Sequence, residues 1–134
     1  MDSVRLIWSL AASGIGTTIA AAGNSGGWSN ANVNAESALD LRWTDDLTIM
    51  AACTGITSTP TLSVFLDLYD DQGNLYAAVG TGPVVTAANT GKLASFGSHA
   101  PTSSLYLALP SWGRISWTCT GGSTTGTEIA VYGR

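Results

Sequence analysis

The fold is decided by the stretch Thr61-Leu62-Ser63-Val64-Phe65-Leu66-Asp67-Leu68-Tyr69, in which leucine or valine occupies every second position. The alternation stops at the turn-forming run Asp70-Asp71-Gln72-Gly73-Asn74 and resumes at Leu75-Tyr76-Ala77-Ala78-Val79. A period of two on both sides of a Gly/Asn turn is typical of a β-hairpin. We therefore expect antiparallel sheet in the centre of the chain.

The same pattern continues in both directions. Strands bounded by Asp, Asn, Gly or Pro are expected over residues 4–11, 36–44, 47–54, 61–69, 75–80, 83–87, 93–97, 104–109, 113–120 and 127–132. Short strands at such regular spacing are typical of sandwiches and barrels. We predict an all-β chain with a single domain over residues 1–134. Its architecture would be an antiparallel β-sandwich or a jelly-roll-like barrel of about eight to ten short strands.

Alternation also assigns the side chains of each strand to two faces. The faces expected to form the core carry Leu39, Leu41, Trp43, Leu62, Val64, Leu66, Leu68, Leu105, Leu107, Leu109, Ile115, Trp117 and Cys119. The faces expected to meet solvent carry Asp40, Arg42, Ser63, Phe65, Asp67, Tyr69, Tyr106, Ala108, Arg114, Ser116 and Thr118. Burying one leucine contributes about 1.5–3 kcal/mol, so the first set is sufficient for a stable domain.

Residues 13–35 differ from the rest of the chain in composition. Gly, Ala, Asn, Ser and Thr dominate, and the apolar residues show no regular spacing. This stretch is predicted to be a flexible loop or arm with at most a short strand at 17–22. Loops of this length are usually functional or disordered. We expect it to become ordered against a neighbouring subunit.

Charge is sparse: only 10% of the 134 residues are charged, although 45% are hydrophobic. The apolar fraction excludes a disordered chain, and no apolar run is long enough for a membrane helix. Nucleic acid is not an expected partner, because the five basic residues are scattered and the net charge is -4. A neutral, hydroxyl-rich surface favours packing against other protein.

The sequence offers no convergent catalytic or metal-binding group. His99 is the single histidine, and no serine lies in a Gly-x-Ser-x-Gly turn. The acidic run from Asp67 to Asn74 fits a hairpin turn, because position 12 of a calcium loop would be Ala78 rather than Glu. We expect no enzyme activity, no cofactor and no metal.

Cys53 and Cys119 each stand near a strand end on a predicted core face, followed by Thr-Gly. Two buried free thiols are the favoured interpretation, and a disulfide remains the alternative. The N-terminus alternates as a first strand does, with an acid at position 2 and early glycines, so a cleaved signal is not expected.

Four aromatic residues are candidates for an interface: Trp28, Tyr69, Tyr76 and Trp112. They are expected in turns or on faces opposite the core leucines. Exposed aromatics mark a protein interface or a sugar-stacking platform. The alternative is that residues 13–35 simply cover the second face.

Three segments resemble small virion structural proteins of tailed bacteriophages. They are the hairpin Leu66-Asp67-Leu68-Tyr69-Asp70-Asp71-Gln72-Gly73-Asn74-Leu75-Tyr76, the stretch from Leu107-Ala108-Leu109-Pro110 through Trp117-Thr118-Cys119-Thr120-Gly121, and the end Glu128-Ile129-Ala130-Val131-Tyr132-Gly133-Arg134. The resemblance implies a capsid decoration (cement) protein made in the host cytoplasm and located in the virion. Its partners would be further copies of itself, for example in a trimer, and the major capsid or another virion protein.

Two alternatives stay open at this point. A tail or collar component would share the same motifs. A secreted, extracellular carbohydrate-binding module would instead use the exposed aromatics, and it predicts a cleaved N-terminus and a Cys53–Cys119 bridge.

Overall fold

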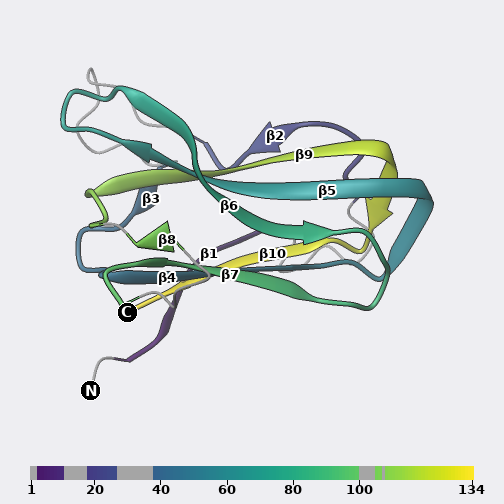
Figure 1. Cartoon of the computed structure of the whole chain (residues 1–134), viewed down its shortest axis with the longest axis horizontal. Coiled ribbons are helices and arrows are strands. Elements are labelled where there is room, and N and C mark those ends of the chain that lie inside the picture. The colour runs from purple at the N-terminus through teal and green to yellow at the C-terminus, as the bar shows by residue number, and fades with distance from the viewer. Residues whose placement is uncertain (1–2, 11–17, 27–37, 100–104, 107) are drawn as a thin grey trace.

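The computed structural model describes residues 3–10, 18–26, 38–99, 105–106 and 108–134, which form two β-sheets packed face to face (Figure 1). No helix occurs among these residues. The all-β class and the β-sandwich architecture predicted from alternation are therefore confirmed.

Sheet A contains five strands in the order β1 (Arg5–Leu10), β10 (Glu128–Gly133), β4 (Asp46–Ala52), β7 (Lys92–Gly97) and β8 (Leu105–Tyr106). Its pairs are antiparallel except for β7 with β8, which is parallel. The three central strands pair in unbroken register, from Glu128 opposite Ala52 to Gly133 opposite Leu47, and from Asp46 opposite Gly97 to Ala51 opposite Lys92.

Sheet B is built on two long strands, β5 (Gly55–Tyr69) and β9 (Trp112–Thr125), which pair along almost their whole length. β6 (Leu75–Val85) lies on the other side of β5. The second edge of β9 pairs with β2 (Gly23–Asn24) and β3 (Leu39–Asp40), and Ile19 forms a bridge with Thr124. These short segments cover an edge that would otherwise expose unpaired backbone groups.

The core lies between the sheets and uses the predicted alternation. Leu62, Val64 and Leu66 of β5 are completely buried. They meet Ile49 of β4, Val131 of β10 and other members of one cluster: Leu39, Leu41, Leu47, Leu68, Val85, Phe96, Ile115, Cys119 and Ile129. Trp117 is half-buried against this cluster and stacks on Trp8, with ring centroids 6.4 Å apart.

Three strands are longer than expected: β5, β6 and β9, the last of which covers Trp112–Thr125 where 113–120 was expected. The expected strands at 75–80 and 83–87 are one strand, β6, because Gly82 lets the backbone pass close to Val64: a Cβ there would lie 2.6 Å from the Val64 carbonyl oxygen. β5 begins six residues before its predicted start because a register shift between Ser58 and Thr61 accommodates Pro60.

The predicted strand at 36–44 is wrong in its described part. Only Leu39–Asp40 is strand, and the chain turns at Arg42 and Trp43. The Asp40 carboxylate accepts a hydrogen bond from the Arg42 backbone N–H and holds this turn. As a result, Trp43 points outward with 82% of its surface exposed, and its predicted place in the core is wrong.

The predicted solvent-facing position of Asp67 is also wrong, because its side chain is completely buried. Opposite it, β6 makes a bulge in which Ala78 has a φ of 51°, and the Ala78 N–H donates to Asp67 Oδ1 at 2.7 Å. The other carboxylate oxygen accepts from Arg114 Nε at 2.8 Å. The bulge and the ion pair together enclose a carboxylate that alternation places on the outer face.

The glycine-rich stretch is described only over residues 18–26, which run along β9. Ser25 Oγ accepts from the Ile115 N–H, and the Ser25 N–H donates to the Ile115 carbonyl oxygen. Residues 13–17 and 27–35 lie outside the described residues, so an arm that orders against a neighbour stays a prediction for them.

Candidate functional site

The outer face of sheet A is left uncovered by the described chain and carries exposed apolar side chains. Directly opposed residues of antiparallel strands share a face, so the register defines its rows. One row crosses β10, β4 and β7 as Ala130, Met50 and Leu93, and the next as Tyr132, Thr48 and Ser95. Leu6 of β1 extends the second row beyond Tyr132.

Apolar side chains stand open on this face. Leu93 is 61% exposed, Leu6 53% and Met50 42%. These side chains and the neighbouring alanines lie side by side across four strands, whereas a scattered exposed leucine is ordinary on a protein surface. The face therefore has the composition of a contact surface.

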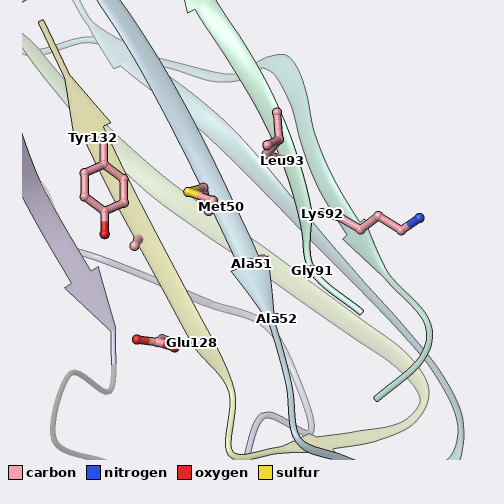
Figure 2. Close-up of a pocket in the computed structure, with 9 residues that line it drawn as sticks. Met50, Ala51, Ala52, Gly91, Lys92, Leu93, Glu128 and Tyr132 are labelled. Atoms are coloured by element: carbon pink, nitrogen blue, oxygen red, sulfur yellow. The ribbon is translucent and has the colours of Figure 1, made fainter. Parts of the chain in front are cut away.

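A shallow groove of about 340 Å³ runs across one end of this face, over β4 (Figure 2). Its apolar part is formed by Met50, Ala52, Leu93 and Ala130. Lys92 lies on the β7 side of the groove and Glu128 on the β10 side, and their side chains point in opposite directions. Lys92 pairs with Ala51, which faces the core, whereas Glu128 pairs with Ala52 on the outer face, so the charged side chain at the margin of the apolar groove is Glu128.

The opposite end of sheet A holds a polar cluster around Asp46. Asp46 Oδ1 accepts from the His99 backbone N–H at 2.8 Å, and Oδ2 lies 3.0 Å from His99 Nδ1 and 3.5 Å from Arg134 Nε. Partial burial alone would raise the pKa of Asp46, but the hydrogen bonds from His99 outweigh it, so the pKa lies below its usual value.

This cluster does not have the geometry of a nucleophilic relay. Ser98 Oγ lies 3.2 Å from His99 Nδ1, the same ring nitrogen that contacts Asp46. A relay needs the nucleophile on one ring nitrogen and the orienting carboxylate on the other. The contacts instead fasten the turn after β7 to the start of β4.

The four aromatic interface candidates are not brought together. Tyr69 is 5% exposed, so its assignment to an open surface is wrong. In sheet B it lies between Leu75 of β6 and Trp112 of β9. Tyr76 is 55% exposed, and its hydroxyl donates to Asp70 Oδ2 at 3.1 Å. Trp28 lies outside the described residues.

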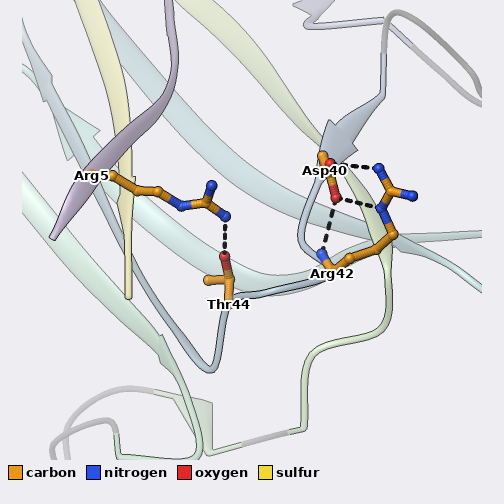
Figure 3. A network of polar contacts seen from close by, with 4 residues as sticks. All are labelled: Arg5, Asp40, Arg42 and Thr44. Carbon is orange, nitrogen blue, oxygen red and sulfur yellow. Dashed lines mark hydrogen bonds and ion pairs between the residues drawn. The ribbon is translucent and has the colours of Figure 1, made fainter. Parts of the chain in front are cut away.

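Trp112 was expected in a turn, but it opens β9 and is half-buried. The Arg42 guanidinium lies 4.8 Å from the centre of its ring. Arg42 is held there by two side-chain hydrogen bonds to Asp40, at 3.0 and 2.9 Å (Figure 3). The side-chain hydrogen bond from Arg42 also lowers the pKa of Asp40. In the same view Arg5 donates to Thr44 Oγ1 at 3.4 Å.

The two cysteines are free and buried, as favoured from the sequence. Burial raises the pKa of both the Cys53 and the Cys119 thiol. Among the residues that the structure describes, no group of three or more His, Cys, Asp and Glu side chains could hold a metal ion. In the same part of the chain, no helix is long and apolar enough to cross a membrane.

Sequence reasoning missed the outer face of sheet A. Its signal was the run Leu47-Thr48-Ile49-Met50-Ala51-Ala52, in which both faces of the strand carry apolar or small neutral side chains. A strand that faces water on one side usually alternates between apolar and polar residues. From Thr48 to Ala52 the second face of β4 carries no charge, which predicts that this part of the strand is covered.

No protein-family model matches the chain, and no curated protein matches it. Its fold is similar to parts of two solved structures of infectious bursal disease virus. The match to the Gx strain has a TM-score of 0.39 with 14% identity, and the match to the Gt strain has a TM-score of 0.35 with 12% identity. They cover 98% and 97% of this chain but only 32% and 31% of the viral chains. The chain thus spans about a third of their length, and no residue's role follows from so distant a likeness.

Proposed function

We propose that the protein is a structural subunit of a virus particle that binds other protein through the outer face of sheet A. Within that class we propose a capsid decoration protein on the outer shell of a tailed phage. The observation that carries the assembly role is the uncovered, uncharged centre of this face, where Met50, Leu93 and Ala130 adjoin.

The arrangement fits what is known of protein interfaces. Their centres are depleted of charge and their rims are polar. On this face Glu128 lies at the margin of the groove, and Asp46 lies at the opposite end of β4. Removing apolar surface from water contributes roughly 25 cal/mol per Å², so covering Leu6, Met50 and Leu93 favours association.

The virus-particle assignment is supported by the turn and strand-end motifs that resemble phage virion proteins. A chain with 10% charged residues also suits a protein that packs against other subunits. A carbohydrate platform has less support: Tyr69 is buried, Trp112 lies under Arg42, and the two thiols are free.

Quantitative mass spectrometry of purified particles tests the proposal. Hundreds of copies per particle are expected for a shell-wide decoration protein. A handful of copies would replace it with a tail or collar role, and absence from purified particles would contradict the particle role altogether.

A pair of matched variants tests the surface. Leu93→Asp places a charge in the centre of the outer face of sheet A, and Val84→Asp does the same on sheet B, where Val84 is 37% exposed. We expect Leu93→Asp to lose incorporation into particles and Val84→Asp to retain it, with both variants folded. Equal incorporation would show that the outer face of sheet A is not the contact.

A further inference from the structure

Trp43 is the most exposed of the large hydrophobic side chains that the structure describes, at 82%. It stands in the turn between β3 and β4, where the chain crosses from sheet B to sheet A at one end of the sandwich. Tryptophan is highly buried on average, because covering its ring removes about 150–250 Å² from water. An indole left this open therefore indicates a contact with another molecule.

The two ends of this turn are anchored inside the protein. Leu41 is 1% exposed, and its N–H donates to the Ser111 carbonyl oxygen at 2.8 Å. Thr44 is 6% exposed, and its N–H donates to the Leu41 carbonyl oxygen at 3.1 Å. Thr44 Oγ1 also accepts from Arg5 at 3.4 Å (Figure 3). Trp43 thus projects from a backbone that is fixed on both sides.

The other residue at the tip of the turn, Arg42, is held as well. Its backbone N–H, Nε and Nη2 all donate to the Asp40 carboxylate, and its guanidinium lies over the Trp112 ring. A Trp side chain on a fixed backbone has only two torsions to order on binding, so its contact area costs little conformational entropy. Trp43 therefore has the features of an interface anchor.

The charges around Trp43 favour a protein partner over a lipid surface. The same segment carries the carboxylates of Asp40, Asp45 and Asp46, and the chain has a net charge of -4, which anionic lipid headgroups repel. A membrane-surface anchor instead combines several apolar side chains with Lys and Arg. One indole among carboxylates does not have that composition.

The neighbouring polar groups also fit a protein better than a sugar. A sugar-stacking ring needs hydrogen-bonding groups beside it that are free to meet hydroxyls, whereas Asp40 and Arg42 bond to each other. A protruding indole is complementary to a concave apolar pocket. That pocket would also offer an acceptor to the indole N–H, which is a hydrogen-bond donor.

We infer that Trp43 inserts into an apolar pocket on a neighbouring protein of the particle and anchors this chain there. The inference rests on the proposed function and adds to it a second contact, which lies outside the outer face of sheet A. It names the chemistry of the partner: a cavity large enough for an indole, apolar on its walls and with a hydrogen-bond acceptor.

Competition for incorporation tests the anchor. Isotopically labelled wild-type protein and an unlabelled variant are supplied in equal amounts during particle assembly, and mass spectrometry of purified particles gives their ratio. We expect Trp43→Ala to be incorporated at least about tenfold less than wild type, because truncating an anchor residue weakens binding by at least that factor. Trp43→Phe keeps an apolar ring and should recover part of this loss.

Ile56→Ala is the matched control, because it truncates a side chain that is 43% exposed at the opposite end of sheet B. It should be incorporated like wild type, and melting curves should show all variants folded. Equal incorporation of Trp43→Ala and wild type would overturn the inference and leave the particle role intact. Absence of the wild type from particles would overturn both. Binding of wild type, but not of Trp43→Ala, to phosphatidylcholine vesicles would replace the protein pocket with a membrane.

Discussion

The outer faces of the two sheets differ in what covers them. On sheet B, the end near Asp67 and Tyr69 is enclosed by the chain itself, through the Ala78 bulge, the Arg114 ion pair and the Arg42–Trp112 contact. On sheet A, the side chains of Leu6, Met50 and Leu93 remain exposed to solvent. Both faces carry large apolar side chains, so composition alone does not distinguish a self-covered face from an interface.

The difference lies in the polar groups around the apolar ones. On sheet B they bond within the chain: Asp67 and Arg114 satisfy each other, and Asp40 holds Arg42 over an indole. On sheet A the Asp46 cluster bonds within the chain at one end, whereas Met50 and Leu93 remain exposed. Polar groups that bond to one another over apolar side chains indicate a closed face, and apolar side chains without such a cover indicate a face open to a partner.

The largest expected effect separates the two faces of one strand, β7. Phe96 is 1% exposed on the inner face and Leu93 is 61% exposed on the outer face. Phe96→Ala should lower the free energy of unfolding by about 3–5 kcal/mol, because it removes a ring from a packed core. Leu93→Ala, which removes an exposed side chain, should change it by less than about 0.5 kcal/mol. Similar losses in urea denaturation would show that the faces are assigned wrongly.

The next effect concerns the closure of sheet B. Asp67→Asn keeps the shape but removes the charge, so Arg114 loses its ionised partner in a mostly buried position. The loss should be about 3 kcal/mol, at the lower end for broken buried ion pairs because Arg114 is 20% exposed. Asp71→Asn in the exposed turn is the control. If Asp67→Asn melted like that control, the ion pair would not close the face.

The smallest expected effect is a loss of stability in acid. The hydrogen bonds that Asp70 accepts, above all from the Asn74 side chain, lower the pKa of Asp70. For Asp46, burial alone would raise the pKa, but the hydrogen bonds from His99 outweigh burial and lower it. An unfolded Asp has a pKa of about 3.9, so their contribution is present above that pH and is lost as pH falls through the lower folded values. Melting temperature should therefore decline below about pH 4, and less so in Asp70→Asn. If the melting temperature of Asp70→Asn declined in acid as much as that of the wild type, the hydrogen bonds of Asp70 in this turn would not contribute to the acid sensitivity.

Much of the fold could be predicted from sequence because a period of two survives wherever one strand face is buried. It placed Leu62, Val64, Leu66 and Ile115 correctly in the core. It failed at Trp43, because the hydrogen bond that the Asp40 carboxylate accepts from the Arg42 N–H ends the strand early. It also failed at Asp67, because the bulge that buries the carboxylate depends on a partner strand eleven residues away.

The candidate site was harder to predict than the fold. The sequence predicted exposed interface positions for Tyr69 and Trp112. Their actual exposure depends on long-range contacts that the alternation of residues within a strand does not describe. The open face instead uses Met50, Leu93 and Ala130, which are unremarkable as single residues. Their meaning comes from the register that places them in one row.

Thiol labelling at position 50 tests most directly whether the outer face of sheet A is a contact surface in the particle. Met50→Cys places a thiol in the centre of this face, and Thr81→Cys places an exposed thiol on β6 of sheet B as the control. We expect both thiols to react with a maleimide in the free protein, and Met50→Cys to be protected in purified particles while Thr81→Cys still reacts. Equal labelling of Met50→Cys in the free protein and in particles would contradict the account.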